Sequence, residues 1–132
     1  MKKTIILLTL IFTVMFSSPS YAEWTKVSES VDGTTFYVDF ERIRKHGGYV
    51  YYWVLSDYLK PNEFGDLSAK VYKQGDCKLF RNKTLSENYF IEPMGGGTPK
   101  VWELTKFQKD WMYPSPNSVD EFVLKTVCAY AK

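Results

Sequence analysis

The stretch GGYVYYWVLSDYLKP, residues 47–61, decides the fold because it holds four tyrosines and a tryptophan in a run of strand-forming residues. In a strand over residues 49–59, successive side chains point to opposite faces of the sheet. One face then carries Tyr49, Tyr51, Trp53 and Leu55, and the other carries Val50, Tyr52 and Val54. Both faces are apolar. This pattern is typical of a central strand in a sheet covered on two sides, one by a helix and the other by a loop or a second subunit.

Two interpretations of this strand differ in the role of its aromatic side chains. In the first, both faces are packed into the core and the sheet. In the second, Tyr49, Tyr51 and Trp53 form a partly exposed face that binds a ligand or a second copy of the chain. The second has support because one helix of about 13 residues covers only part of a sheet of about five or six strands.

The sequence around this strand alternates with the same period of two, over residues 24–92, and turn residues interrupt it. Asp32-Gly33 is a hairpin signal, because a type I′ turn needs positive φ at both central residues and glycine adopts it freely. Gly47-Gly48 predicts another turn, and FERIRK at residues 40–45 predicts a single helical turn before it. The expected sheet is therefore antiparallel, with about five or six strands.

The C-terminus has a helical period instead. In SVDEFVLKTVCAYAK, residues 118–132, apolar side chains recur at spacings of three and four and form a stripe of Val119, Phe122, Val123, Val127 and Tyr130. Ser118 and Glu121 form a capping box, in which the serine oxygen accepts from a backbone N–H and the glutamate reaches back. The helix is expected to begin at Val119 and to pack on the sheet, which gives an α+β fold.

Residues 1–22, MKKTIILLTLIFTVMFSSPSYA, have the pattern of a cleaved secretory signal peptide. Two lysines precede an uncharged run shorter than a membrane span, and Ser20 and Ala22 are the small residues that signal peptidase reads. A retained membrane anchor is the alternative. Cleavage after Ala22 leaves residues 23–132 as a single domain without a further transmembrane segment. The expected location is the periplasm, the outer-membrane surface or the medium.

The chain has two cysteines, Cys77 and Cys128. An exported protein occupies a compartment in which disulfides persist, so one intramolecular bond between them is predicted. A free or intermolecular thiol is the alternative. Because Cys128 lies near the end of the predicted helix, the bond would fasten this helix to the sheet.

Charge and composition argue against several functions. The domain that remains after cleavage has equal numbers of basic and acidic residues, so it has no general attraction to nucleic acid. The single histidine, His46, lies at a predicted turn, which disfavours a metal site or a Ser-His-Asp arrangement. Cysteines bonded to each other cannot act as nucleophiles. We therefore expect a non-enzymatic protein with no catalytic residues, no metal site and no cofactor.

Residues 94–117 separate the predicted sheet from the predicted helix, and their middle, residues 101–109, fits a strand or a short helix equally well. Aromatic and basic residues are interleaved there: Lys100, Trp102, Lys106, Phe107, Lys109 and Trp111. Aromatic residues exposed in a loop suit a protein interface, so these six residues are the predicted binding site. Solvated lysines above buried aromatic rings are the alternative interpretation.

Several short motifs occur in a characteristic order along the domain. They are WTKV at residues 24–27, YVD at 37–39, WVLSDY at 53–58, SAK at 68–70, DC at 76–77, MG at 94–95 and VC at 127–128. This ordered combination resembles the bacterial surface-adhesin protein E family over essentially the whole mature domain. The resemblance implies an antiparallel sheet with a C-terminal helix fastened to it by a disulfide. It also implies binding of host extracellular-matrix proteins such as vitronectin and laminin, a homodimer, and haem binding.

Two functions are consistent with these observations. The first is an exported, non-catalytic binding module, an adhesin that docks a host extracellular-matrix protein or another protein through residues 100–111. The second is a periplasmic subunit for envelope maintenance or assembly, whose partner is another bacterial protein or a second copy of the chain. Location separates the two, because an adhesin must be reachable from outside the cell.

Overall fold

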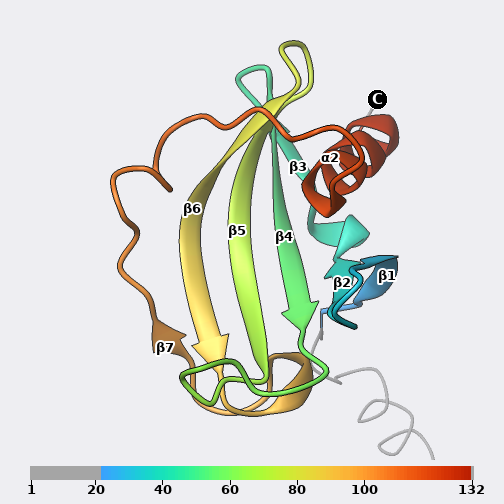
Figure 1. The fold of residues 1–132 in the computed structure, drawn as a ribbon. Coiled ribbons are helices and arrows are strands. Elements are labelled where there is room, and N and C mark those ends of the chain that lie inside the picture. Colours follow the sequence, from blue (N-terminus) through green and yellow to red (C-terminus); the bar gives the residue numbers. More distant parts are fainter. Residues whose placement is uncertain (1–21, 132) are drawn as a thin grey trace, which may run out of the picture.

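The computed structural model describes residues 22–131 as a seven-stranded antiparallel sheet with one α-helix at its C-terminus (Figure 1). The strands are β1 (Thr25–Glu29), β2 (Thr35–Val38), β3 (Arg44–His46), β4 (Tyr49–Asp57), β5 (Ser68–Asp76), β6 (Arg81–Phe90) and β7 (Lys100–Val101). The α-helix is α2 (Val119–Tyr130), and two 3-10 helices are η1 (Phe40–Arg42) and η2 (Pro93–Gly95). The predicted α+β fold is confirmed. The predicted signal peptide, except Ala22, lies outside the described residues.

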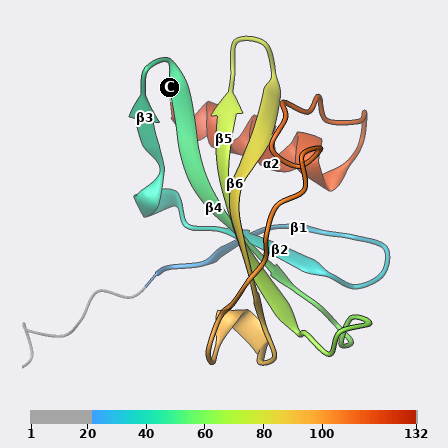
Figure 2. The ribbon, with the colours of Figure 1, turned by 90° about the vertical axis from the view of Figure 1, so that its left-hand side faces the viewer.

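The sheet contains two short strands that the alternating pattern does not indicate. They are β3 and β7, which are three and two residues long. The order is β1-β2-β4-β5-β6-β7, and β3 pairs with the free end of β4. Within β4, residues 54–57 pair with β2 and residues 49–51 pair with β3 on the same side of the strand. Figure 2 shows the β1–β2 hairpin running across the direction of β5 and β6, so the sheet is strongly twisted.

The aromatic stretch forms the central strand that its sequence predicts, but it ends at Asp57 and not at Leu59. Beyond Asp57 the chain enters a loop in which the Tyr58 N–H donates to the Leu67 carbonyl. At the other end, Gly47 and Gly48 have φ values of 59° and 84°, as a two-residue type I′ turn requires. The β1–β2 hairpin differs from the expected type I′ turn. Only Gly33 has positive φ there, and Ser30 N–H donates to the Thr34 carbonyl across a three-residue loop.

The core lies between one face of the sheet and α2. Its buried side chains are Val38, Val50, Tyr52 and Val54 from the sheet and Val123, Leu124 and Val127 from the helix. The helix begins at Val119, as predicted, and the Glu121 N–H donates to Ser118 Oγ at 3.1 Å. The predicted apolar stripe was wrong in part. Leu124 faces the core, whereas Phe122 and Tyr130 are 50% and 57% exposed, because the buried stripe runs through residues 123, 124 and 127.

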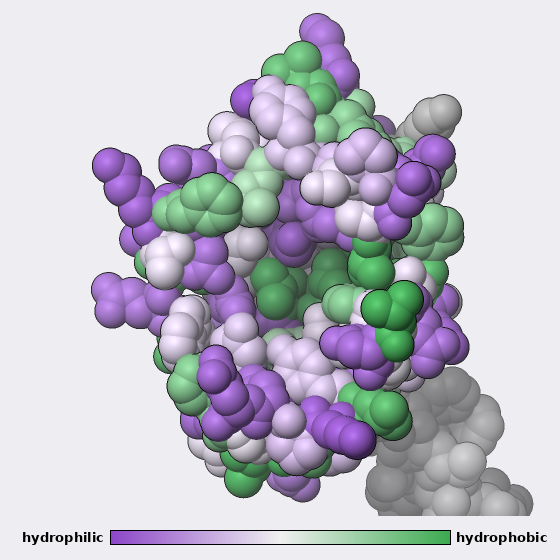
Figure 3. All heavy atoms as spheres, in the orientation of Figure 1, coloured by the Kyte–Doolittle hydropathy of each residue, from purple (hydrophilic) through white to green (hydrophobic). Residues whose placement is uncertain are grey.

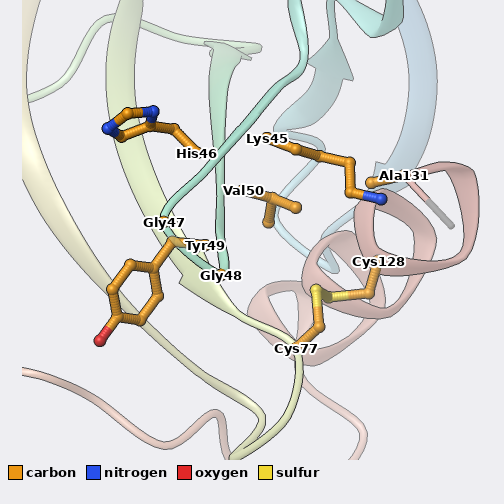
Figure 4. Close-up of a pocket in the computed structure, with 9 residues that line it drawn as sticks. All are labelled: Lys45, His46, Gly47, Gly48, Tyr49, Val50, Cys77, Cys128 and Ala131. Carbon is orange, nitrogen blue, oxygen red and sulfur yellow. A yellow bond between two sulfur atoms is a disulfide. The ribbon is translucent and has the colours of Figure 1, made fainter.

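The predicted disulfide is confirmed: Cys77, in the turn after β5, is bonded to Cys128 in the last turns of α2, with Cα atoms 5.7 Å apart. Figure 4 shows the bond beside a cavity of about 380 Å³, whose opposite wall is the β3–β4 turn. The side chain of Lys45 extends there toward Ala131 at the end of the helix. Because Cys77 follows β5 and Cys128 lies on α2, the bond holds the two layers of the fold together.

Candidate functional site

The two faces of the sheet are covered unequally. We call the side that carries α2 the helix face and the opposite side the open face. At one end of the open face η2 folds back, where the Met94 N–H donates to Asp57 Oδ1 and the Gly95 N–H donates to Ser68 Oγ, both at 2.8 Å. Leu55 is therefore fully buried, whereas Tyr49, Tyr51 and Trp53 are partly exposed. Each interpretation of the aromatic stretch thus describes a part of it.

Five aromatic side chains lie on the open face in two packed groups, one of three rings and one of two, which we together call the aromatic row. Its members are Trp53, Tyr72, Tyr51, Tyr49 and Trp111, and all of them are partly exposed. The ring centroids of Trp53 and Tyr72 are 4.7 Å apart, and those of Tyr51 and Tyr72 are 6.3 Å apart. The Trp111 ring lies 5.5 Å from that of Tyr49. These spacings are those of packed aromatic pairs.

Basic side chains stand at the Trp111 end of the aromatic row. The Arg81 guanidinium lies 4.3 Å from the Trp111 ring centroid, and Lys83 Nζ lies 4.8 Å from it. Arg81 is held in place because its Nε donates to the carboxylate of Asp76 at 3.0 Å. Burial would raise the pKa of Asp76, but hydrogen bonds from the Leu79 N–H, from Arg81 and from the Lys78 N–H lower this pKa overall.

The Trp53 end of the row opens into a cavity of about 440 Å³, which Trp53 and Trp24 line together. Lys70 reaches into this region, with Nζ 5.9 Å from the Trp24 ring and 5.1 Å from the Phe90 ring. Arg42 also lines the cavity, and its Nε lies 3.2 Å from the buried carboxylate of Asp39. A second pair of cations therefore stands at this end of the row.

The six predicted binding residues do not form one cluster, and whether they bind a ligand stays a prediction. Lys100 forms an ion pair with Asp66 on the helix face of the sheet edge. Trp102 packs there against Phe64 and Tyr89, with centroids 6.0 and 5.8 Å away. Lys106, Phe107 and Lys109 are exposed, and Trp111 alone crosses to the open face.

Residues 102–113, which we call the edge segment, follow β7 along the side of β6 (Figure 1). The segment has little secondary structure but is fastened at both ends. Trp102 N–H donates to the Glu87 carbonyl, and Met112 and Asn82 exchange two backbone hydrogen bonds of 2.8 and 3.0 Å. Between them, Thr105 and Gln108 bond to each other, and Gln108 Nε2 donates to Glu87. The result is an ordered turn on which Phe107 is 71% exposed.

The helix face has a groove next to the N-terminus of α2. In Figure 3 this face is hollowed at its centre, and hydrophobic residues lie inside the hollow. The cavity measures about 460 Å³ and is lined in part by Phe36, Val54, Val71, Val119 and Val123. Its polar wall is already engaged. Lys73 Nζ lies 3.2 Å from both Asp120 and Asn82, and Asn82 donates to Asp120 at 3.0 Å. This network joins the start of the helix to β5 and β6.

Three of the residues that build the open face were not expected from the sequence: Tyr72, Arg81 and Lys83. Period-two alternation assigns each of them to a side of its own strand. It does not say which strands are neighbours, and β5 and β6 also carry a register shift next to Tyr72. Only the pairing of β4, β5 and β6 brings these side chains to Tyr51 and Trp111.

Within residues 22–131, no three His, Cys, Asp or Glu side chains come close enough to hold a metal ion. No helix of this part of the chain is long and apolar enough to cross a membrane. The haem that the family resemblance implies would need an axial ligand directed into a cavity. The ring of His46, which is exposed, points away from the disulfide cavity (Figure 4). Tyrosine and methionine also serve as axial ligands, so haem binding stays a prediction.

Comparison with solved structures identifies the same fold in protein E of Haemophilus influenzae. One crystal form of that protein has a TM-score of 0.65 and 18% identity, over 86% of this chain and 94% of that chain. A selenomethionine form has a TM-score of 0.62 and 17% identity, over 84% and 89% of the two chains. No curated protein matches the chain. The family model for surface-adhesin protein E matches residues 24–129, so the chain belongs to the surface-adhesin protein E family.

Proposed function

We propose that the protein is an exported binding module, an adhesin that docks a host extracellular-matrix protein through the edge segment. Membership of a family of surface adhesins supports export and a non-enzymatic role. The observation that carries the site is the ordered turn at residues 105–108, which presents Phe107 between Lys106 and the nearby Lys109, all exposed. An exposed aromatic ring on a fixed turn can dock with little loss of conformational freedom.

The surroundings of this turn also suit an interface. Trp102, Met112 and Tyr113 of the same segment are 45%, 39% and 65% exposed, so large apolar side chains gather along one edge of the molecule. Interfaces are enriched in aromatic residues and methionine. Lys100 forms an ion pair with the buried carboxylate of Asp66. We propose that this ion pair fixes the start of the edge segment against the sheet.

The test compares two variants of the exported, purified protein on immobilised vitronectin and laminin. The first carries Lys106→Ala, Phe107→Ala and Lys109→Ala. The control carries Leu59→Ala and Lys60→Ala, which remove an exposed apolar residue and an exposed lysine from another loop. We expect the first variant to lose at least about tenfold in affinity and the control to bind as the parent does. Equal binding by all three proteins, with unchanged melting temperatures, would refute the site.

A periplasmic subunit for envelope maintenance or assembly is the second candidate, because a partly exposed aromatic face also suits a second copy of the chain or another bacterial protein. Protease treatment of intact cells separates the two. Degradation of the protein on intact cells supports the adhesin. Protection that ends when osmotic shock opens the envelope supports the periplasmic subunit.

A further inference from the structure

The geometry points to a second binding surface: the aromatic row on the open face, which fits an anionic polysaccharide chain. This surface lies across the sheet from the helix and differs from the exposed turn proposed above for protein docking. Its two packed groups of rings follow one another along β4, and cations stand at both ends. None of these residues has a part in the core around α2.

The length of the row suits a polymer better than a small molecule. Tyr49 and Trp53 are four residues apart on one strand, which places them about 13 Å apart. Trp111 extends the row beyond Tyr49, and the cavity beside Trp24 extends it beyond Trp53. A pyranose ring has a face of C–H groups that stacks on Trp and Tyr rings. Successive rings of a glycan could therefore rest on successive members of the row.

The charge of the open face is positive although the mature domain is neutral. Strand pairing places Arg44 opposite Tyr51 and His46 opposite Tyr49, so both residues share the face of the row. Arg81 and Lys83 belong to the same face. Two strand carboxylates share this face: Asp76 is buried and bonded to Arg81, and Asp57, at the end of β4, accepts the Met94 N–H. At the Trp53 end of the row, the Asp39 carboxylate is paired with Arg42. Lys70 is therefore the cation at that end that Asp39 does not neutralise.

Sulfate and carboxylate groups along a glycan would meet these cations while the sugar rings stack. Arg81 and Lys83 cover the Trp111 ring, so an anionic group of a sugar that rests on the neighbouring Tyr49 ring would meet both cations. Ser86, which is paired with Tyr72, is partly exposed and supplies a polar group beside the rings for a sugar hydroxyl, whereas Gln74 opposite Tyr51 is buried. Anionic polysaccharides are abundant outside the cell, and this distinguishes them from single-stranded nucleic acid, which also stacks on such rows.

The experiment titrates the exported protein with a heparin-derived oligosaccharide and follows tryptophan fluorescence and calorimetric heat. The parent is compared with Trp111→Ala and with Lys83→Gln, which keeps the side chain polar and removes its charge. The matched control is Lys106→Ala with Phe107→Ala, because it also removes one lysine and one exposed ring. A desulfated oligosaccharide and a single-stranded DNA of similar length are the competing probes.

We expect saturable binding that weakens with added salt, and an affinity about tenfold lower for Trp111→Ala and clearly lower for Lys83→Gln. The control should bind as the parent does, and the desulfated probe should bind more weakly. The inference is overturned if binding of the oligosaccharide to the parent does not reach saturation. It is also overturned if Lys83→Gln and Trp111→Ala both bind the oligosaccharide with the affinity of the parent. Single-stranded DNA that binds as tightly, with the same dependence on Trp111, would overturn it in favour of a nucleic-acid site.

The two proposals fail independently. Suppose that the variant of the edge-segment turn loses matrix-protein binding and that the parent does not bind the oligosaccharide. The proposed function then stands, and this inference is removed. Oligosaccharide binding that depends on Trp111, without matrix-protein binding, would do the reverse. Unchanged melting temperatures for Lys83→Gln establish that an altered affinity comes from the site and not from unfolding.

Discussion

Tyr52 is the largest side chain that the core encloses completely, and its hydroxyl has no hydrogen-bond partner among the described residues. Burial, and then the negative charge of Asp120, raise the pKa of this phenol. A buried polar group without a partner costs free energy, because the unfolded chain hydrates it. Tyr52 therefore stabilises the fold through its ring and opposes it through its oxygen.

The change Tyr52→Phe tests this balance. We expect the free energy of unfolding to stay within about 0.5 kcal/mol of the parent or to rise, because the ring is kept and an unpaired hydroxyl is removed. Urea denaturation followed by circular dichroism measures it. A loss of more than about 1 kcal/mol would show that the hydroxyl makes a hydrogen bond in solution.

Asp76 makes the stability depend on acid pH. Its folded pKa lies below the unfolded value of 3.8. The carboxylate therefore contributes its full stabilisation above that value, and the contribution is lost as the pH falls through the lower folded pKa. We expect the melting temperature of the parent to fall in this acid range. In Asp76→Asn, the melting temperature should fall less between neutral pH and this acid range. Thermal melts at a series of pH values measure the fall. An equal fall in the parent and in the variant would contradict this role for Asp76.

At the scale of elements, the close approach of α2 to β5 depends on a glycine. A Cβ on Gly75 would lie 2.9 Å from Leu124 Cδ1, 2.9 Å from Val50 Cγ2 and 3.1 Å from Tyr52 Cε1. The first two distances are shorter than real Cβ contacts and the third is tighter than most, so Leu124 and the facing β4 side chains must shift to admit any side chain here. Glycine is needed at this position because there is no room for a side chain, and not because the backbone adopts a positive φ.

We expect Gly75→Ala to destabilise the fold by about 1–3 kcal/mol, as overpacked cores do. Truncation of Leu124 to Ala makes room for the new methyl group. The double variant should therefore lose less than the sum of the two single changes, and a double-mutant cycle of unfolding free energies measures the coupling. Strict additivity would mean that the Cβ meets no resistance from the helix.

The same elements show how far the sequence alone predicts this structure. Period-two alternation locates the long strands, and the Ser118–Glu121 spacing locates the first helical residue, because both signals are local. Strands of two or three residues, such as β7, leave no periodic signal. The rotation of the helix, which buries Leu124 and exposes Phe122, depends on where the sheet lies. Part of the aromatic row was predictable, as the exposed side of β4. The contact of Trp111 with Tyr49 was not, because it depends on the pairing of Met112 with Asn82 in a distant segment.

On the scale of the whole molecule, the disulfide is the main cross-link between layers. It joins residues that are 51 positions apart, and loop-entropy arithmetic for such a span gives about 4 kcal/mol. The helix makes its other contacts through a few apolar side chains and through the network of Asp120 with Lys73 and Asn82. The bond therefore supplies a large share of what holds α2 to the sheet.

Replacement of Cys128 by Ser should lower the melting temperature by more than about 10 °C, since roughly 4 kcal/mol shifts a domain of this size by at least that much. The double change at Cys77 and Cys128 is the control. It should melt like the single variant if the loss comes from the bond and not from a stray thiol. A single variant that melts with the parent would contradict this role for the disulfide.

The edge segment is anchored to β6 at both ends, through Trp102 and through Met112, and the residues between them take no part in the core. Its length and composition can therefore drift during evolution at little expense to folding, while its two attachment points keep their places. The same property makes this stretch a natural grafting site: a foreign peptide inserted between residues 103 and 107 would be displayed on a disulfide-stabilised scaffold.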